Sequence, residues 1–321
     1  MTILKETVKI TLAFALLAAL VPLLVFAGRD KQRSEPAAAK TTGTAVKVLY
    51  EKSGKTVSYD ETEFIALSLM AQIPQSYEDE AIMAQAVLVR TYLERRRNSG
   101  ESLKGGALVS DDRSRFQTFF SKAQAKKLFE ADYDSVFERF CKLAQMTEGE
   151  MLEYEGEPVL PAYHAVSCGL TRSAKDAWGE DIAYLVSVES KADKNSPDFS
   201  HKITLTDSEL KKKLEKAFGD LDSENEKGKS LLEIECDKNG FIKSAEIFGS
   251  EVSGGELCRA LGLDSPCVEV SRKSGKVTFK VKGVGHLVGL SLYGANEMAR
   301  AGKTHKEILE YYFKGASLET N

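Results

Sequence analysis

Ala71-Gln-Ile-Pro-Gln-Ser-Tyr-Glu-Asp-Glu-Ala-Ile-Met-Ala-Gln-Ala-Val-Leu-Val-Arg-Thr-Tyr-Leu93 is the stretch of sequence that decides the fold. Pro74 ends one apolar segment, and the acidic cluster 78–80 then opens a second segment that is apolar on almost every side. A helix of this kind has no polar face to turn toward water, so it is expected to be buried. The stretch therefore predicts a central helix over residues 78–97, around which the rest of the chain packs.

Two polar side chains interrupt this helix, and a third lies at its start. Gln85 and Arg90 must be paired if the helix is buried, and we expect Arg90 to brace it. Glu80 shares one face of the helix with three smaller residues, Ala84, Val87 and Thr91. Two interpretations of Glu80 remain open: an ordinary acidic helix start, or an acid at the wall of a cleft.

The composition is that of a globular protein with a sizeable core. The chain has 321 residues, 42% hydrophobic and 29% charged, with a formal net charge of −4. Because its lysines are interleaved with acidic residues, no basic surface for nucleic acid is expected.

The N-terminus indicates the compartment. Residues 10–27 are apolar except for Thr11, which makes a segment near the minimum length of a membrane span and long for a signal-peptide core. Val25-Phe26-Ala27 is a poor cleavage site, which favours a retained anchor over a removed signal. We therefore predict a cytoplasmic tail (1–9), a transmembrane helix (10–27), a linker (28–44), and an extracytoplasmic remainder.

The irregular alternation of short strands and capped helices predicts an α+β fold, a single mixed domain over residues 45–316. Residues 101–146 are expected to be mostly polar loop with short helices, and 220–229 a surface loop. The expected strands are 46–50, 56–59, 151–154, 158–165, 183–188, 231–236, 242–248, 267–271 and 276–281. The expected helices are 61–72, 78–97, 121–132, 206–218, 254–261 and 304–314.

The five cysteines are odd in number and include no close C-x-x-C pair. They therefore form neither a disulfide framework nor a zinc ribbon. Pairing of Cys258 with Cys267 is left open by their spacing.

A glycine-rich stretch follows one of the last predicted strands: Gly283-Val-Gly-His-Leu-Val-Gly-Leu-Ser-Leu-Tyr-Gly-Ala295. Its glycines imply close backbone approach and unusual φ values. Two interpretations remain open: a tight strand-to-helix corner in which backbone satisfies His286, or a site where His286 and Ser291 approach a polar ligand. The lysine of a phosphate-binding loop is absent.

A third stretch, Tyr163-His-Ala-Val-Ser-Cys-Gly-Leu-Thr171, holds Ser, Cys and His close together in sequence. Neighbouring residues on a strand point to opposite faces, and no G-x-S-x-G elbow is present, so a serine or cysteine hydrolase is disfavoured. A metal site formed by His164, Cys168 and His286 is a further alternative, although its spacing matches no known pattern.

Together these stretches resemble the SpoIID/LytB family of peptidoglycan-degrading proteins. Residues 80–92 match the family segment Glu-Ala-Leu-Lys-Ala-Gln-Ala-Val-Ala-Ala-Arg-Thr-Tyr, and residues 283–295 match Gly-x-Gly-His-Gly-Val-Gly-Met-Ser-Gln-Tyr-Gly-Ala. Residues 167–178 resemble the family's Ser-x-Gly-x-Thr loop, and 259–263 its Arg and Leu-Gly-Leu segment. The resemblance runs in order from residue 46 to residue 315.

The resemblance implies a lytic transglycosylase that cleaves MurNAc-GlcNAc bonds of glycan strands without water or cofactor. Such chemistry needs one carboxyl group, which protonates the leaving oxygen and then accepts the proton of the sugar's own C6 hydroxyl. Glu80 is the residue expected in this role. The residues expected to line the glycan cleft are Tyr163, His164, Ser167, His286, Ser291 and Tyr293. The family further implies sporulation, a cell-wall amidase partner, and a location between the mother-cell and forespore membranes.

The sequence departs from the family pattern at three places, and two of them, Gln72 and the altered last motif, support an alternative: a non-catalytic peptidoglycan-binding scaffold that recruits the amidase. Family members usually have Glu-Met-Pro where this chain has Gln72-Ile73-Pro74, and an amide cannot donate and recover a proton in that way. A His-Cys-Gln segment associated with zinc corresponds to residues 115–117, Arg-Phe-Gln, so we expect no metal there. Leu287 and Leu292 replace Gly and Gln in the last motif.

Overall fold

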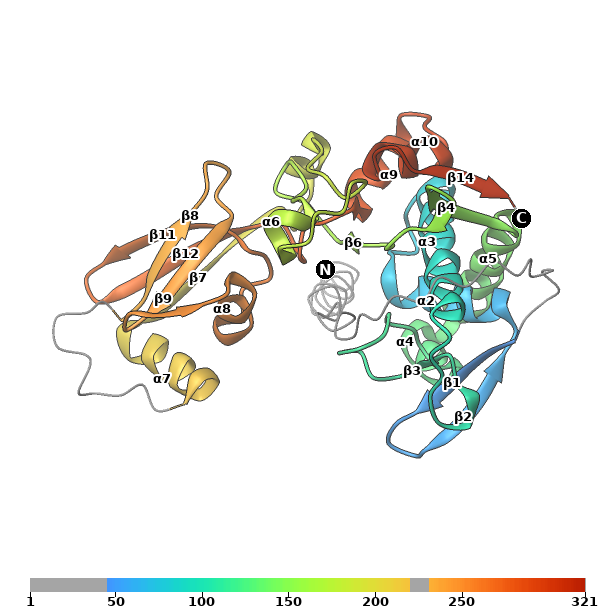
Figure 1. The fold of residues 1–321 in the computed structure, drawn as a ribbon, viewed down its shortest axis with the longest axis horizontal. Helices are drawn as coiled ribbons and strands as arrows, with labels where there is room; N and C mark the ends of the chain where they lie inside the picture. Colours follow the sequence, from blue (N-terminus) through green and yellow to red (C-terminus); the bar gives the residue numbers. More distant parts are fainter. Residues whose placement is uncertain (1–44, 220–230, 321) are drawn as a thin grey trace. The chain divides into compact units, whose positions relative to one another are not determined.

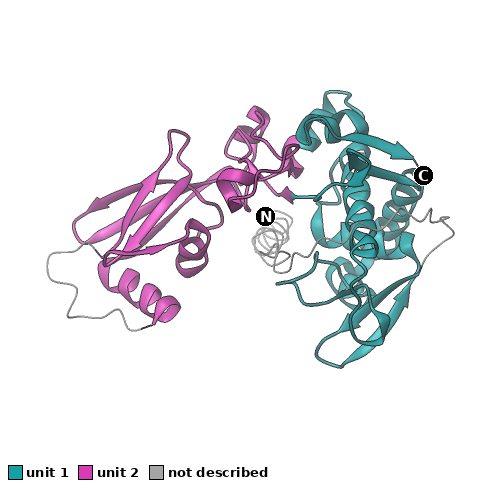
Figure 2. Ribbon diagram, in the orientation of Figure 1, with its two compact units in different colours: residues 1–162, 295–321 teal, residues 163–294 magenta. Residues whose placement is uncertain are grey.

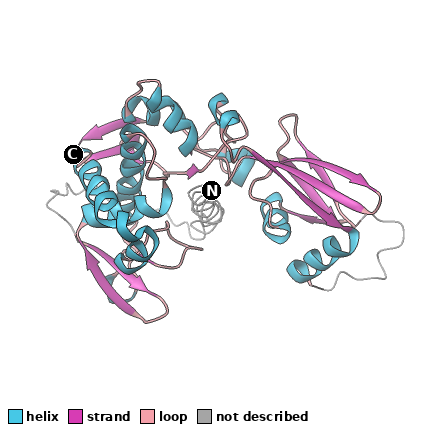
Figure 3. Cartoon of the chain, turned by 180° about the vertical axis from the view of Figure 1, so that it is seen from behind, coloured by secondary structure: helices cyan, strands magenta, loops and turns pink. Residues whose placement is uncertain are grey.

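The computed structural model describes residues 45–219 and 231–320 of the chain (Figure 1). These residues form two compact units: unit 1 comprises residues 45–162 and 295–320, and unit 2 comprises residues 163–294 (Figure 2). The mixed α+β composition is confirmed, with helices most abundant in unit 1 (Figure 3). The domain predicted over 45–316 thus consists of two units, the second inserted within the first.

The predicted tail, membrane span and linker of residues 1–44 lie outside the described residues, as does the predicted loop at 220–229. Among the residues that the structure describes, no helix is both long enough and apolar enough to cross a membrane.

Unit 1 packs its helices around α3 and adds two small sheets, with strand orders β2-β1-β3 and β14-β4-β5. The α9 helix (Leu292–Arg300) crosses the boundary between the units. The other elements are β1 (Val46–Tyr50), β2 (Lys55–Tyr59), α2 (Glu61–Gln72), α3 (Asp79–Asn98), η1 (Lys104–Gly106), β3 (Val109–Ser110), α4 (Lys122–Phe129), η2 (Glu130–Asp132), α5 (Tyr133–Met146), β4 (Glu150–Tyr154), β5 (Glu157–Pro158), α10 (His305–Tyr312) and β14 (Ser317–Thr320).

The predicted central helix is confirmed as α3, which packs against α2, α5, α10 and β4. Its apolar side chains from Ala81 to Leu93 are buried, as expected for a helix without a polar face. Arg90 braces it by donating to the carbonyls of Ala144 (2.8 Å) and Thr147 (2.5 Å), at the C-terminus of α5. Because helical N–H donors run out in the last turn of α5, its carbonyls there can accept from the guanidinium, and these bonds pair the buried charge of Arg90.

Unit 2 combines two three-stranded antiparallel sheets, ordered β10-β9-β8 and β11-β12-β7, with a short parallel pair, β6 and β13. Turns at Asn239-Gly240 and Ser274-Gly275 connect β8 to β9 and β11 to β12. The elements are β6 (Tyr163–His164), α6 (Ala174–Trp178), η3 (Lys191–Asn195), β7 (Ser200–Thr206), α7 (Asp207–Phe218), β8 (Glu233–Cys236), β9 (Ile242–Ile247), β10 (Ser250–Val252), α8 (Gly254–Leu261), β11 (Cys267–Lys273), β12 (Lys276–Lys282) and β13 (Leu290–Ser291).

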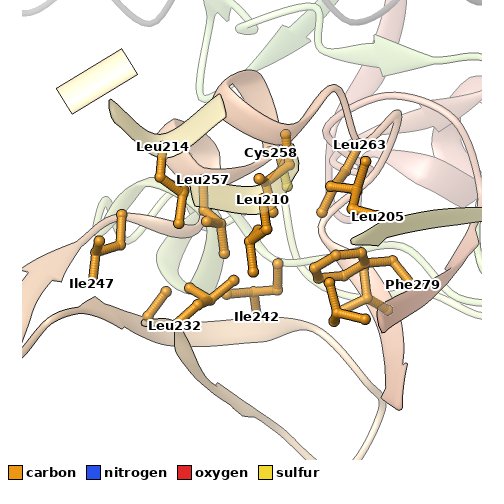
Figure 4. Packing of buried hydrophobic residues seen from close by; sticks show 14 of the residues in the cluster. Leu205, Leu210, Leu214, Leu232, Ile242, Ile247, Leu257, Cys258, Leu263 and Phe279 are labelled. Carbon is orange, nitrogen blue, oxygen red and sulfur yellow. The ribbon is translucent and has the colours of Figure 1, made fainter. Parts of the chain in front are cut away.

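The main core of unit 2 lies where α7 and α8 cover the strands (Figure 4). Leu210 and Leu214 of α7 meet Leu257 of α8, and these side chains pack over Ile242 and Phe279. All five are fully or almost fully buried, so this apolar contact holds the unit together.

Three expectations for individual elements were wrong. Residues 133–146, expected to be loop and short helices, form α5, whose buried Tyr133, Val136 and Phe140 follow a helical period. Residues 183–188 form no strand; Thr171 binds this segment through its backbone and hydroxyl instead, at Val188. The strand expected at 158–165 is reduced to two short pieces, β5 and β6.

Candidate functional site

Glu80 ties the start of α3 to the start of α10. Its Oε2 accepts from the backbone N–H of His305 (2.6 Å) and lies 2.8 Å from the ring Nδ1 of the same residue. The other ring nitrogen, Nε2, lies 2.9 Å from Glu150 Oε2 on β4. Each ring nitrogen of His305 thus faces the carboxyl group of one glutamate. We call Glu80, His305 and Glu150 the glutamate–histidine clasp.

The face of α3 that carries Glu80 is a packing face of unit 1. Thr91, three turns further along this face, accepts a hydrogen bond from the N–H of Leu152 on β4 (3.1 Å). At the start of the helix, the N–H of Glu78 donates to Asn296 of α9 (2.8 Å). The Glu80 side chain is 36% exposed, so it lies at the edge of the contact between α3 and its neighbours in unit 1.

Gln72 sits in a different environment. It is 7% exposed at the end of α2, donates from Nε2 to the carbonyl of Thr118 (2.7 Å), and accepts at Oε1 from Gln85 Nε2 (2.7 Å). Gln85 comes five residues after Glu80, a rotation of about 140° around the helix. The Gln72–Gln85 amide pair therefore lies on a different side of α3 from the clasp.

The segment that corresponds to the family's zinc-associated His-Cys-Gln does not fit a metal ion. Phe116 is buried, and two cations lie near its ring: the guanidinium carbons of Arg96 and Arg115 are 5.3 and 5.4 Å from the ring centroid. Neither Arg nor Phe is a zinc ligand, and the two charges would repel a cation. Within residues 45–219 and 231–320, no three His, Cys, Asp or Glu side chains are grouped as metal ligands would be.

The two remaining sequence motifs meet in unit 2. The parallel strands β6 and β13 place Tyr163 opposite Leu290 and His164 opposite Ser291. Gly283 allows this approach, because a Cβ at its position (φ 78°) would lie 2.8 Å from the carbonyl oxygen of Val166.

Ser167 and Ser291, one from each motif, bind a buried carboxylate. Asp193 of η3 accepts from Ser167 Oγ (2.9 Å), Ser167 N (3.2 Å) and Ser291 Oγ (2.6 Å), and also from Ser190 Oγ. Asp193, Ser167 and Ser291 have no exposed surface. Burial raises the pKa of Asp193, and these donors oppose that rise. The serines thus hold the two motif loops together through Asp193.

His164 and His286 form an aromatic group with Trp178, the only tryptophan in the chain. The ring centroid of His286 lies 6.0 Å from that of His164 and 5.5 Å from that of Trp178. His164 Nδ1 bonds the carbonyl of Val288 (3.1 Å), and His286 Nδ1 accepts from the N–H of Val288 (3.1 Å). The Nε2 atoms of both rings are buried without a hydrogen-bond partner.

Burial keeps both imidazoles neutral. It lowers the pKa of His164 to about 3, and the neighbouring His286 ring lowers it further, with the Val288 carbonyl opposing. Burial also lowers the pKa of His286 to about 4, against the influence of the Tyr163 carbonyl. His164 is fully buried, whereas His286 and Trp178 are partly exposed, so the latter two are the members of this group that a ligand can reach.

Leu287, where the family motif has Gly, adopts φ 65°, in the left-handed region. A leucine there costs about 1 kcal/mol more than glycine. Its side chain is fully buried against Cys168, Phe241 and Cys267, and this packing offsets the strain.

The site residues predicted from sequence thus fall in both units. Glu80 belongs to unit 1, while unit 2 brings the other six together around β6 and β13; these are Tyr163, His164, Ser167, His286, Ser291 and Tyr293. Their contact with glycan stays a prediction. Sequence reasoning missed Asp193, His305 and Trp178, of which only Trp178 carried a signal, as the single tryptophan at the end of the family-like loop.

Comparison with known proteins agrees with the resemblance seen in the motifs. Residues 51–154 match the family described as SpoIID, stage II sporulation protein. Stage II sporulation protein D of Bacillus subtilis (strain 168) is 33% identical over 258 residues, 80% of this chain and 73% of that protein. The Bacillus amyloliquefaciens protein of the same name is 31% identical, over 90% of this chain and 83% of its own length. The amidase enhancer of Bacillus subtilis (strain 168) is 24% identical, over 77% of this chain and 39% of that protein. This chain belongs to the SpoIID family.

Proposed function

We propose that this protein is a membrane-anchored, peptidoglycan-binding protein of endospore formation that acts with a cell-wall amidase and does not cleave glycan itself. It would work in the space between the mother-cell and forespore membranes. The names of its relatives, stage II sporulation protein D and amidase enhancer, support the sporulation role and the amidase partner. The apolar segment 10–27 supports the anchor.

The non-catalytic interpretation rests on the amide at position 72. Gln72 faces one hydrogen-bond acceptor, the Thr118 carbonyl, and one donor, the Gln85 amide. A protonated carboxylic acid would satisfy both partners as well as an amide does, whereas a carboxylate would repel the carbonyl. Position 72 is therefore suited to a carboxyl group held in its acid form, as a transglycosylase needs, and this chain has glutamine there.

A second candidate is the lytic transglycosylase with Glu80 as acid and base. It is favoured by the exposure of the Glu80 side chain, which is 36% exposed at the start of α3. Against it, Oε2 of Glu80 is engaged by two nitrogens of His305, which hold the group as a hydrogen-bond acceptor. A general acid must instead present a proton to the leaving oxygen.

The two candidates predict different products from glycan strands stripped of stem peptides. We expect the full-length protein to bind the strands and release no anhydro-muropeptides, as measured by mass spectrometry. Gln72→Glu should then create the missing acid, so that anhydro-muropeptides appear. The matched controls are Gln85→Glu, which places a carboxyl on the other side of the same amide pair, and Glu157→Gln, an exposed glutamate on β5.

Release of anhydro-muropeptides by the unaltered protein, abolished by Glu80→Gln, would overturn the non-catalytic proposal in favour of the second candidate. If the protein does not bind glycan strands at all, both candidate functions are wrong.

Trp178 provides a direct test of glycan binding. An aromatic ring offers an apolar face to the C–H groups of a sugar, and Trp178 is partly exposed beside His286. We expect Trp178→Ala to weaken binding to glycan strands at least about tenfold, a typical loss for a buried aromatic anchor. Isothermal titration calorimetry would measure this, with Val270→Ala, an exposed apolar residue on β11, as the control. Unchanged affinity in Trp178→Ala would place glycan binding elsewhere.

A further inference from the structure

Two cysteine side chains from distant parts of the sequence meet in unit 2. Cys168, in the loop after β6, and Cys267, at the start of β11, pack in the same small cluster of buried side chains. Both residues are buried, with 8% and 1% exposure, in one apolar cluster with Phe241 and Leu287. Each thiol also reaches a backbone carbonyl, that of Leu170 for Cys168 (3.6 Å) and that of Asn239 for Cys267 (3.5 Å).

The pairing that sequence spacing had left open, Cys258 with Cys267, is not the one that this arrangement favours. The Cys258 thiol bonds the carbonyl of Ser265 (3.6 Å) and belongs to the core between α7, α8 and the sheets, not to the cluster of Cys267. All five cysteines of the chain are thiols in the structure.

We propose that Cys168 and Cys267 are a redox pair, which an external disulfide oxidant converts into an intramolecular disulfide. The bond would fasten the Ser167 loop to the edge strand β11. Because Ser167 binds Asp193, and Asp193 binds Ser291, the same bond would fix the junction of the two motif loops. The extracytoplasmic location proposed above is the kind of compartment in which such a bond persists.

The chemistry is an ordinary thiol–disulfide exchange. The neighbouring Cys267 thiol lowers the pKa of Cys168 against the effect of burial, and the positive charge of Lys282 lowers it further; the Cys168 thiol and burial raise the pKa of Cys267. The Cys168 thiolate attacks a disulfide such as oxidised glutathione, and one glutathione leaves as thiolate. The sulfur of Cys267, losing its proton, then displaces the second glutathione from Cys168. Two thiols and one glutathione disulfide thus become one protein disulfide and two reduced glutathiones.

The test is peptide mapping of the full-length protein after equilibration with oxidised or reduced glutathione. Remaining thiols are blocked with iodoacetamide before digestion without reductant. We expect a linked peptide containing Cys168 and Cys267 only after oxidation, and alkylated Cys141, Cys236 and Cys258 in both states. Five alkylated cysteines after oxidation, a stable glutathione adduct on Cys168, or a Cys258–Cys267 peptide would each overturn the proposal.

Stability provides a second, independent readout. Closing a loop between residues 168 and 267 restricts the unfolded chain, so oxidation should raise the melting temperature by on the order of 10 °C. Cys168→Ser and Cys267→Ala should each abolish this shift, whereas Cys258→Ser should keep it. If one variant does not fold, the other and the unaltered protein still decide the question. A shift that persists in Cys267→Ala would contradict the assignment.

Discussion

Replacing Asp193 with alanine is expected to lower the free energy of unfolding by about 3–5 kcal/mol, because buried donors lose their acceptor. Asp193 accepts from the backbone N–H of Ser167 and from the hydroxyls of Ser167, Ser190 and Ser291. None of Ser167, Ser291 and Asp193 has surface through which water could replace these bonds. Asp193→Asn keeps one carbonyl oxygen as an acceptor, so its cost should be smaller, about 1–2 kcal/mol.

Urea denaturation followed by circular dichroism measures both variants. Asp181→Ala is the matched control: Asp181 is an exposed aspartate of unit 2 paired with Lys175, and its removal should cost less than about 1 kcal/mol. The same experiment bears on Ser167 and Ser291. If Asp193→Ala lowers the free energy of unfolding by no more than the control does, the Asp193 bonds do not hold these serines in place. Ser167 and Ser291 would then be available to bind a ligand.

Acidification should destabilise the protein through its two neutral histidines, by about 2 kcal/mol for each between pH 6.5 and pH 4.5. Burial lowers the pKa of His164 to about 3 and that of His286 to about 4. In the unfolded chain both would titrate near 6.5, so over this range unfolding takes up protons, and stability falls as the pH falls. The raised pKa of Asp193 acts in the opposite sense, since it favours the folded state as pH falls.

The histidine contribution is isolated by comparing variants at each pH. The double variant His164→Gln, His286→Gln retains hydrogen-bonding side chains that do not titrate, so its stability should depend much less on pH than that of the unaltered protein. His201→Gln is the control, because His201 lies at the surface beside Asp264. Equal pH slopes in the double variant and the unaltered protein would show that the two rings do not titrate as their burial requires.

Local patterns in the sequence were sufficient to predict much of the fold. The α2 helix begins after Asp60 and ends before Pro74, as its cap and its proline predicted, and α8 spans its predicted residues 254–261. The predicted strand at 183–188 failed for a reason that no local pattern reveals: the hydrogen-bonding partner of this segment is the side chain and backbone of Thr171. A largely apolar run forms a strand only when another strand is available to pair with it.

The candidate site was less accessible from sequence, because its polar groups are paired over long distances. Asp193 and His305 carry no motif of their own; what defines them is a partner about a hundred residues or more away, Ser291 for the one and Glu80 for the other. Glu80 illustrates the ambiguity directly. The same acidic residue at a helix start suits a cap, a clasp or a catalytic acid, and only the positions of His305 and Glu150 distinguish them.

The insertion of unit 2 within unit 1 has a consequence for biosynthesis. A ribosome delivers residues 45–162 first, but α10 and β14, which cover α3 and pair with β4, emerge only after all of unit 2. Until then the Glu80 end of α3 and one edge of β4 stay uncovered, and such surfaces attract chaperones and other chains. Unit 2 is continuous in sequence and can fold during this interval. The clasp between Glu80 and His305 can therefore form only after unit 2 has been synthesised and α10 has followed it.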